Sequence, residues 1–429
     1  MKILYLCPDL GIPVLGRKGA SVHVRELIGA FARAGHQVTL AAHTLLKSPN
    51  DEPARVKARV LQIPSAPAIA AAAKALKEFN ARLGVESSLP GELRRIGYND
   101  TLYRELKWRF LKHKPHFIYE RASLYATAGA RLAAKFKVPH IVELNAPLAI
   151  EQSAYRATGF GELAAKAERH TLTHADAIIV VSTELAKHVR KLGVSAKKIH
   201  VMPNGVNPEL FFNSSSSSSS SSFSPLVRRG GSRTRTRTTT RTTEALTLGF
   251  VGGLRPWHGV EVLPRLLAHL SKRHPGIRLV IAGDGQLRGD LEREFKRRKL
   301  TRRVTCTGAL PHEDVPAVIR QFDIALAPYP KHDHDFYFSP LKLFEYMACG
   351  VAVVASDVGQ IAEVVQHGKT SLLYPPGNFA ALAARCELLL ANPQLRAALG
   401  AAAAREMAKK YTWDINAART VRLAMRLKR

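Results

Sequence analysis

The hydrophobic positions of this chain alternate between two periods. Short apolar runs rich in β-branched residues predict strands, and longer segments with apolar residues at helical spacing predict helices between them. Such alternation predicts a parallel sheet with helices on both faces. The interval 48–111 is less regular than the rest. In the first half, the strand-like runs are 2–8, 37–43, 116–121, 140–145, 177–182 and 199–203, and the clearest helical segments are 21–35, 124–137 and 182–193.

The same alternation restarts in the second half of the chain. Strand-like runs occupy 246–252, 278–283, 303–309, 323–329, 352–357 and 371–377, helical patterns occupy 259–273 and 362–368, and the tail 391–429 is helical and basic. We therefore predict two α/β domains, residues 1–208 and 245–405, followed by a C-terminal helix over 406–429.

A low-complexity insertion over 209–244 separates the two halves. Nine consecutive serines precede an alternation of arginine and threonine. This composition cannot bury enough apolar surface to offset its ordering entropy, so we expect a disordered, solvated linker. Nucleic-acid binding by this arm is the less favoured alternative, because charge runs without aromatic residues carry little specific information.

Composition sets broad limits on the class of protein. The 429 residues, 46% hydrophobic and 23% charged, suffice for two globular domains. The four cysteines are far apart and form no C-x-x-C pair, so we expect buried thiols and neither a disulfide framework nor a zinc site. No targeting or membrane-spanning segment stands out, which favours a cytoplasmic protein. The net charge of +30 is compatible with nucleic acid, anionic lipid or anionic substrates.

The segment FSPLKLFEYMACG, residues 338–350, carries the most specific chemistry. Ser339 as cap and Pro340 as first residue predict a helix start. The free N–H groups and partial positive charge of a helix start suit a phosphate, and Lys342 adds a cation in the first turn. Glu345, one turn deeper, could accept hydrogen bonds from sugar or ribose hydroxyls. An amphipathic core helix ended by the following glycine is the alternative.

Two loops that follow strands offer further candidates. GRKGASVH, with Gly16, Gly19 and His23, favours a close backbone approach to a phosphate or an acceptor, although an ordinary turn with a packed histidine fits equally. VMPNGVN contains an Asn-Gly turn at Asn204, which is either structural or part of a site.

The loop FVGGLRPWHGVE, residues 250–261, predicts a helix that begins near Gly259. Arg255 and His258 flank that start and could hold an anion, since the guanidinium fork suits phosphate. The HDHD run at 332–335 offers closely spaced ligands without distant partners, so we predict no metal site there.

The order of these motifs resembles family 4 of the retaining glycosyltransferases. The resemblance covers nearly the whole chain except the insertion, and rests on HVRELIGAFARAGHQVTL, VVSTEL, VMPNGVN, FVGGLRPWHGVE, AGDG, FSPLKLFEYMACGVAVVAS and PPGN. It implies the GT-B architecture of two Rossmann-like domains facing across a cleft, with the C-terminal helix crossing back to the N-terminal domain. The N-terminal domain would bind an acceptor and the C-terminal domain a nucleotide sugar. The reaction would be sugar transfer with retention, without metal or cofactor.

The chain departs from the family pattern at its donor motifs. Members often carry Glu, seven residues, then Glu; here Glu345 takes the second position and Tyr337 the first, which leaves the donor sugar open. The Arg and Lys that commonly hold the diphosphate correspond to Gly253 and His258. The resemblance therefore implies that Arg255 and Lys342 supply the charge.

In the N-terminal half, many members place a histidine after a central strand. The corresponding stretch reads VELNAP, so Glu143 and Asn145 are the nearest polar candidates, and the resemblance places Asn204 at the interdomain turn. The expected catalytic set is Glu345, Lys342, Glu143 and Asn145, and the expected donor-binding set is Gly253, Arg255, His258, Gly259, Tyr337, Ser339, Pro340, Leu341, Lys342 and Glu345.

Two other functional classes remain open on the sequence. One is a basic, non-catalytic protein that binds nucleic acid or an anionic membrane; the other is a nucleotide-sugar epimerase or phosphorylase of the same fold. The partners expected for the favoured hypothesis are a nucleotide-sugar donor, a sugar or lipid-linked acceptor and an anionic membrane surface, whereas nucleic acid is not expected.

Overall fold

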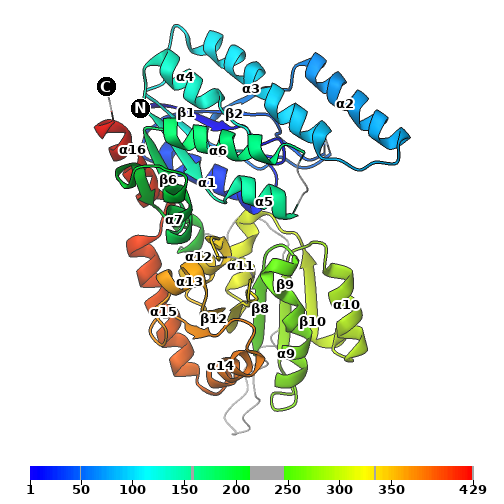
Figure 1. Cartoon of the computed structure of the whole chain (residues 1–429). Coiled ribbons are helices and arrows are strands. Elements are labelled where there is room, and N and C mark those ends of the chain that lie inside the picture. Colours follow the sequence, from blue (N-terminus) through cyan, green and yellow to red (C-terminus); the bar gives the residue numbers. More distant parts are fainter. Residues whose placement is uncertain (49, 156–158, 213–245, 333–334, 428–429) are drawn as a thin grey trace. The chain divides into compact units, whose positions relative to one another are not determined.

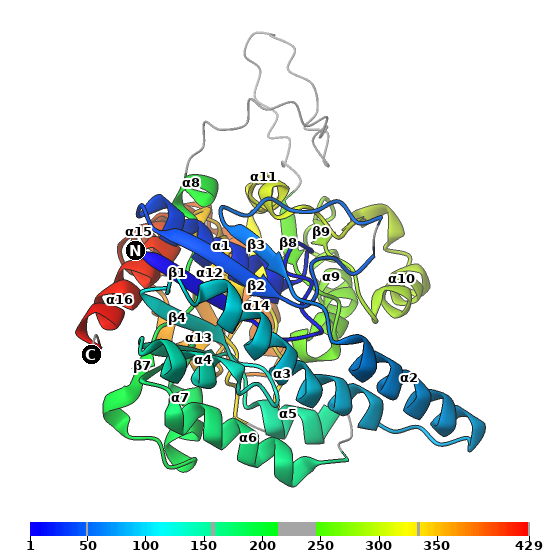
Figure 2. The same ribbon diagram turned by 90° about the horizontal axis from the view of Figure 1, so that it is seen from above.

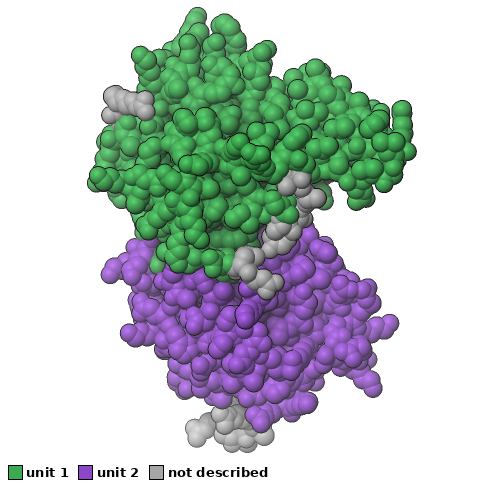
Figure 3. Space-filling view, in the orientation of Figure 1, with its two compact units in different colours: residues 1–205, 335–339, 411–429 green, residues 206–334, 340–410 purple. Residues whose placement is uncertain are grey.

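The computed structural model of this chain describes residues 1–48, 50–155, 159–212, 246–332 and 335–427 (Figure 1). The insertion predicted over 209–244 falls outside these residues from 213 onward. The chain forms two compact units, coloured separately in Figure 3. Unit 1 comprises Met1–Gly205, Asp335–Ser339 and Tyr411–Arg429, and unit 2 comprises Val206–His334 and Pro340–Lys410.

Unit 1 is built on a seven-stranded sheet with the order β3-β2-β1-β4-β5-β6-β7. Every neighbouring pair is parallel, as the alternating pattern predicted. The strands are β1 (Lys2–Cys7), β2 (Gln37–Ala42), β3 (Arg59–Gln62), β4 (Phe117–Arg121), β5 (His140–Leu144), β6 (Ala177–Val180) and β7 (Ile199–Val201).

Helices cover both faces of this sheet. Leu4 and Ile118 point to one face and pack with residues of α3 and α4. Phe117 and Tyr119, one residue out of phase, meet Phe31 of α1 on the other face. The helices of unit 1 are α1 (Gly19–Arg33), α2 (Pro67–Arg82), α3 (Leu89–Phe110), α4 (Ala128–Phe136), α5 (Leu148–Tyr155), α6 (Gly161–His174), α7 (Thr183–Lys191) and the C-terminal α16 (Trp413–Arg426), which packs on α1.

Unit 2 contains a six-stranded parallel sheet with the order β10-β9-β8-β11-β12-β13. The strands are β8 (Thr247–Val251), β9 (Arg278–Ala282), β10 (Val304–Gly308), β11 (Ile324–Ala327), β12 (Ala352–Ser356) and β13 (Leu372–Tyr374). The helices are α8 (Pro208–Phe211), α9 (Leu263–Leu270), α10 (Arg288–Arg297), α11 (Val315–Ile319), α12 (Leu341–Ala348), α13 (Gly359–Val364), α14 (Phe379–Ala391) and α15 (Pro393–Lys410). Figure 2 shows the same elements after a quarter turn.

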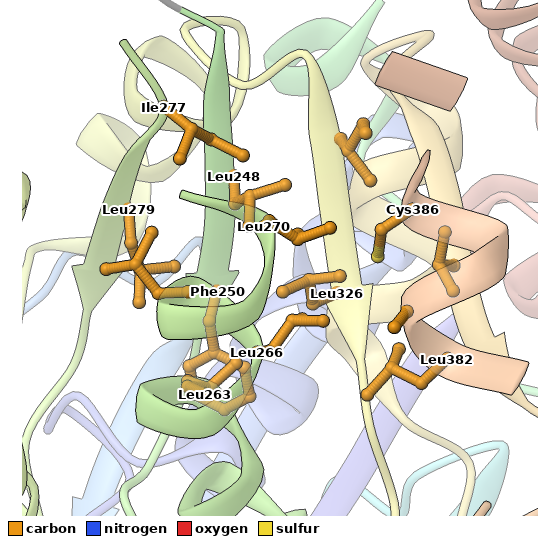
Figure 4. Close-up of a cluster of buried hydrophobic side chains, with 14 of the residues drawn as sticks. Leu248, Phe250, Leu263, Leu266, Leu270, Ile277, Leu279, Leu326, Leu382 and Cys386 are labelled. Atoms are coloured by element: carbon orange, nitrogen blue, oxygen red, sulfur yellow. The ribbon is translucent and has the colours of Figure 1, made fainter. Parts of the chain in front are cut away.

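The main core of unit 2 lies between this sheet and the helices α9 and α14. Figure 4 shows Leu263, Leu266 and Leu270 of α9 against Leu248 and Phe250 of β8. All these side chains are essentially fully buried. The core therefore fixes the position of β8, whose carboxyl end carries the glycine loop of the candidate site.

Several predicted helix boundaries were wrong. The helix predicted over 124–137 begins at Ala128, because Tyr125 adopts a left-handed conformation (φ 65°) and Asn99 binds the backbone of Tyr125 and Thr127. The helix predicted over 362–368 is α13, which ends at Val364. The C-terminal tail is two helices, because Thr412 accepts a hydrogen bond from the backbone of Ile415 and starts α16 separately.

Helix α12 is held against α15 by two glycines. Gly350 follows α12 in the left-handed conformation (φ 69°), and the Val351 N–H donates to the Tyr346 carbonyl, which closes the helix end. Gly400 of α15 lies so close that a β-carbon there would be 1.9 Å from the Gly350 carbonyl oxygen. The position of α12 therefore depends on the absence of a side chain at residue 400.

We predict that Gly400→Ala lowers the free energy of unfolding by about 1–3 kcal/mol, because the added methyl must displace backbone. Urea denaturation of the full chain measures this. Gly289→Ala in α10 is the matched control, since its β-carbon would meet nothing closer than the Arg293 side chain at 3.4 Å. Equal stability of the two variants would contradict the prediction.

Candidate functional site

Both sheets reverse their strand order beside their first strand. In unit 1 the reversal lies between β1 and β4, and in unit 2 it lies between β8 and β11. Ligands of open parallel sheets bind outside the carboxyl ends of the strands at such switch points. The predicted site residues are therefore described at these two edges, each within its own unit.

Lys342 lies at the switch point of unit 2. Its side chain is only 7% exposed, and its Nζ lies 4.2 Å from the ring centre of Phe250, at the end of β8, and 5.3 Å from that of Tyr329, which follows β11. Among the described residues, Nζ has no hydrogen-bond partner. A β-carbon on Gly252 would lie within 3.0 Å of Nζ, so a glycine at 252 makes room for it.

Burial lowers the pKa of Lys342 to about 7, although nearby Glu345 opposes this shift. A buried ammonium without a hydrogen-bond partner is costly, so it is rarely retained without a ligand or a function. Three donors at Nζ are available to an anion.

Glu345 lies one turn further along α12 and is also buried. Its Oε1 lies 2.9 Å from His312 Nε2. The His312 ring in turn contacts the Phe211 ring at 5.6 Å between centres. Sequence reasoning did not single out His312, which lies 33 residues from Glu345.

The loop after β8 brings Gly253, Arg255, His258 and Gly259 together. The Nδ1–H of His258 donates to the Gly253 carbonyl at 2.5 Å, and burial together with Lys342 lowers the pKa of His258 to about 3. A neutral His258 in this tautomer offers an acceptor at Nε2, which suits a hydroxyl better than a phosphate oxygen. Arg255 is exposed and lies against the Trp257 ring.

Gly259 is required by the local backbone. Its φ is 68°, and a β-carbon would come within 1.8 Å of the Pro328 carbonyl oxygen. The α-helix predicted to begin near this glycine begins instead at Leu263, because two short 3₁₀ turns, Pro256–His258 and Val260–Val262, precede it. Arg255 and His258 therefore flank a 3₁₀ turn.

Tyr337 and Ser339 belong to unit 1 in the structure. The Tyr337 hydroxyl donates to Glu151 at 2.5 Å, and the Ser182 hydroxyl donates to the Tyr337 carbonyl at 2.8 Å. The donor-binding role assigned to both residues remains a prediction.

The sequence predicted that Ser339 caps α12, and this prediction was wrong. The N-cap residue is Pro340, and Leu341 begins the helix. The Ser339 hydroxyl instead accepts from the Asn204 backbone N–H at 3.0 Å, while the Asn204 amide donates to the Ser339 carbonyl at 2.7 Å.

At the switch point of unit 1, the structure joins two residues that the sequence proposed separately. His23 of α1 and Glu143 of β5 are buried, with Nε2 and Oε1 2.7 Å apart. The Trp413 ring of α16 contacts the His23 ring edge-on at 4.7 Å. Arg121, the last residue of β4, places Nη1 3.8 Å from Glu143 Oε2.

Glu143 is ionised in this environment. Burial alone would raise its pKa, but His23 and Arg121 outweigh burial, and the pKa lies below the ordinary value. Its Oε2 and Arg121 Nη1 are buried without a hydrogen-bond partner among the described residues. A carboxylate oxygen at a switch point is placed to accept a hydrogen bond or a proton from a hydroxyl.

The remaining candidates of unit 1 lie after β1, after β5 and at the start of α1. Asn145 follows β5, and its amide nitrogen is buried and has no hydrogen-bond partner within the part of the chain that the structure describes. Gly16 lies in the loop after β1, where Arg25 holds its carbonyl at 2.6 Å, and Gly19 begins α1. The sequence did not single out Arg121; the available signal was a charged residue at the end of an otherwise apolar strand.

The described residues lack two features. None of their helices combines the length and the apolar character needed to cross a bilayer. They contain no group of three or more His, Cys, Asp or Glu side chains able to hold a metal ion, and the HDHD run lies partly outside them.

Known protein families match both halves of this sequence. Residues 17–210 match Glycosyltransferase Family 4, and residues 245–392 match Glycosyl transferases group 1. Glycogen synthase of Mycobacterium tuberculosis is 24% identical to this chain over 100% of the chain and 95% of its own length. Alpha-D-kanosaminyltransferase of Streptomyces kanamyceticus is 28% identical over 57% of this chain and 59% of its own length.

Solved structures share the fold of the whole chain. Sucrose-phosphate synthase from Thermosynechococcus elongatus superposes with a TM-score of 0.69 at 20% identity, covering 99% of this chain and 98% of its own. Anabaena HepE, solved in complex with UDP, gives 0.66 at 18% identity and covers 99% of both chains. The two parallel α/β units are thus the two Rossmann-like domains of the GT-B architecture. With glycosyltransferase matches over both domains, this chain is a family 4-like glycosyltransferase with the GT-B fold.

Proposed function

We propose that this glycosyltransferase moves a sugar from a nucleotide-sugar donor, bound at Lys342 in unit 2, to an acceptor bound at Glu143 in unit 1. The observation that carries the proposal is the buried ammonium of Lys342, which has no hydrogen-bond partner among the described residues. Retention of configuration, transfer without a metal ion, a cytoplasmic location and an acceptor that is a glycan, a lipid-linked sugar or a small molecule are parts of the same proposal. They are supported by the family resemblance of the motifs.

The donor half of the proposal follows from charge. When the glycosidic bond to a nucleoside diphosphate breaks, negative charge builds on the phosphates. A cation held in a low-dielectric site stabilises that charge more than it would in water. Lys342 meets this requirement, and the exposed Arg255 can add a second cation from the glycine loop after β8.

Two neighbours of Lys342 can recognise hydroxyl groups of the donor. Glu345 is held by His312, so one of its oxygens is fixed while the carboxylate keeps further acceptor sites. His258 offers Nε2 as an acceptor. We assign both side chains to ribose or sugar hydroxyls of the donor, and leave the identity of the base to experiment.

The acceptor half rests on Glu143. An acceptor hydroxyl must lose its proton as the new glycosidic bond forms, and an ionised carboxylate within hydrogen-bond reach can take part. His23 and Arg121 stabilise the charge on Glu143 before the acceptor binds. We assign Glu143 to the acceptor hydroxyl, and His23 and Arg121 to positioning Glu143.

We predict that one nucleotide series stabilises the chain by binding at Lys342. At a concentration of about 100 Kd, UDP, GDP or ADP, or a sugar conjugate of one of them, should raise the unfolding free energy by about 2–3 kcal/mol. Lys342→Ala should abolish this gain in a thermal-shift experiment, whereas Lys369→Ala, which removes an exposed lysine of the same unit, should retain it. A nucleotide shift unchanged in Lys342→Ala would overturn the donor site.

Lys342 should also reduce the stability of the free protein. Its pKa is about 7 when folded and 10.5 ordinarily, so the unfolded chain binds more protons between these values and stability rises with pH across that window. Lys342→Met should therefore unfold with a free energy about 1–4 kcal/mol higher near neutral pH. The gain should shrink as the pH approaches the ordinary lysine value. Urea denaturation across the window measures this, and a methionine variant less stable than the native chain would contradict it.

Glu143→Gln should separate acceptor chemistry from donor binding. The amide cannot take up a proton, so we expect transfer to fall by roughly a hundredfold or more. The nucleotide-induced thermal shift should persist, because the Lys342 site is untouched. Glu162→Gln, which removes an exposed carboxylate of unit 1, is the control. Loss of the nucleotide shift in Glu143→Gln would count against this division of roles.

A further inference from the structure

The amino-terminal edge of the unit 1 sheet carries a groove of about 600 Å³. It lies where β1, β2 and β3 begin, at the opposite end of these strands from Glu143 and the switch point. Apolar residues such as Ile3, Val38 and Phe110 line part of the groove. Its charged and titratable lining residues are Lys2, Lys57, Arg59, His36 and His113, and no carboxylate is among its lining residues. Since an aqueous groove with only cationic or neutral polar groups attracts anions, its chemistry points to a phosphate-bearing ligand.

The end of α3 continues this basic surface. Residues 107–114 read KWRFLKHK and contain four lysines and arginines without an acidic residue. Phe110 and His113 of this segment line the groove, so the groove and the segment form one continuous surface. We call the groove together with residues 107–114 the amino-edge surface. One of its cations, Arg109, is paired with Glu105 on its rim.

Two large apolar side chains project from the same segment. Trp108 is 70% exposed and Leu111 is 43% exposed. They are three residues apart at the end of α3, a spacing that places them on one side of a helix. The Lys107 ammonium lies 5.5 Å from the Trp108 ring centre. Exposed apolar residues surrounded by cations are typical of surfaces that meet an anionic bilayer.

A lipid surface fits this arrangement better than nucleic acid. Single-stranded nucleic acid is bound by several aromatic side chains on which successive bases stack, whereas the segment exposes one such ring beside an aliphatic leucine. Tryptophan is enriched at the headgroup level of bilayers, and lysine and arginine near the surface are attracted to anionic lipids. The groove, which Phe110 and His113 of the same segment line, can then accept a headgroup phosphate.

We propose that the amino-edge surface is a docking site for anionic phospholipid, with headgroup phosphates in the groove and with Trp108 and Leu111 at the bilayer interface. The surface lies on unit 1 alone and shares no residue with the proposed donor and acceptor sites. Docking does not depend on the identity of the donor, so this proposal and the proposed function can fail separately.

Vesicle co-sedimentation of the full chain tests the proposal. The chain should bind vesicles of phosphatidylcholine mixed with an equal amount of phosphatidylglycerol and should not bind vesicles of phosphatidylcholine alone. Lys57→Glu with Arg59→Glu should weaken binding by about tenfold or more, since both side chains are exposed and line the groove. The charge-matched control is Lys191→Glu with Lys197→Glu, two exposed lysines elsewhere on unit 1, which should bind like the native chain.

Trp108 supplies a second readout that a purely electrostatic attraction would not give. Its fluorescence should shift to the blue on binding anionic vesicles. Trp108→Phe should remove this component, which distinguishes it from the signals of the exposed Trp257 of unit 2 and the buried Trp413. Equal binding by the groove variant and its control, or no fluorescence change at Trp108, would overturn the proposal. Binding of RNA in preference to vesicles would assign the surface to nucleic acid. Saturation of the groove by inorganic phosphate without vesicle binding would assign it to a free anion.

The variants must remain folded and active for these outcomes to count. None of the substituted residues belongs to the donor or acceptor sites, so transfer to a soluble acceptor and the nucleotide-induced thermal shift should match the native chain. A groove variant that loses vesicle binding and keeps both properties supports docking.

Discussion

Parallel pairing of every strand is the constraint on which the rest of this structure depends. Because the strands of both sheets run parallel and are covered by helices, their interiors are almost wholly apolar. Polar side chains that face a ligand can then gather most readily where the strands end. Arg121 ends β4, Glu143 lies one residue before the end of β5, and Gly252 follows β8. The same topology therefore produces both the hydrophobic core and the edge at which each candidate site lies.

Local signals made much of this predictable. Strand and helix periods identified both sheets, and Lys342 and Glu345 followed from the start of one short helix. The contacts that define the environments could not be predicted, because they join distant parts of the chain. His23 and Glu143 are 120 residues apart, and the pKa of Lys342 depends on its burial between β8 and the segment after β11. Strand order and register, which no local pattern encodes, bring these groups together.

The Ser339 cap shows how a distant partner overrides a local preference. Serine before proline favours a capped helix start, but the Ser339 hydroxyl binds Asn204 instead. Unit 1 ends its first segment at Gly205 and its second at Ser339, so this pair ties together two places where the chain leaves the unit. Asn416 of α16 donates to the Pro203 carbonyl at 2.8 Å, which adds the third segment. Hydrogen bonds within unit 1 thus connect all three chain segments of the unit.

The buried charges of the two candidate sites are stabilised in different ways, and the difference fits the proposed reaction. Glu143 has two cationic or polar neighbours that stabilise its ionised form before any ligand arrives. Lys342 has aromatic neighbours and no hydrogen-bond partner among the described residues, so its charge is stabilised fully only when an anion binds. In glycosyl transfer the acceptor hydroxyl needs a carboxylate that is already ionised, whereas the diphosphate gains charge as it leaves. The Lys342 ammonium therefore interacts most strongly with the diphosphate when negative charge builds on it in the transition state. An interaction that is stronger in the transition state than in the ground state lowers the barrier to sugar transfer.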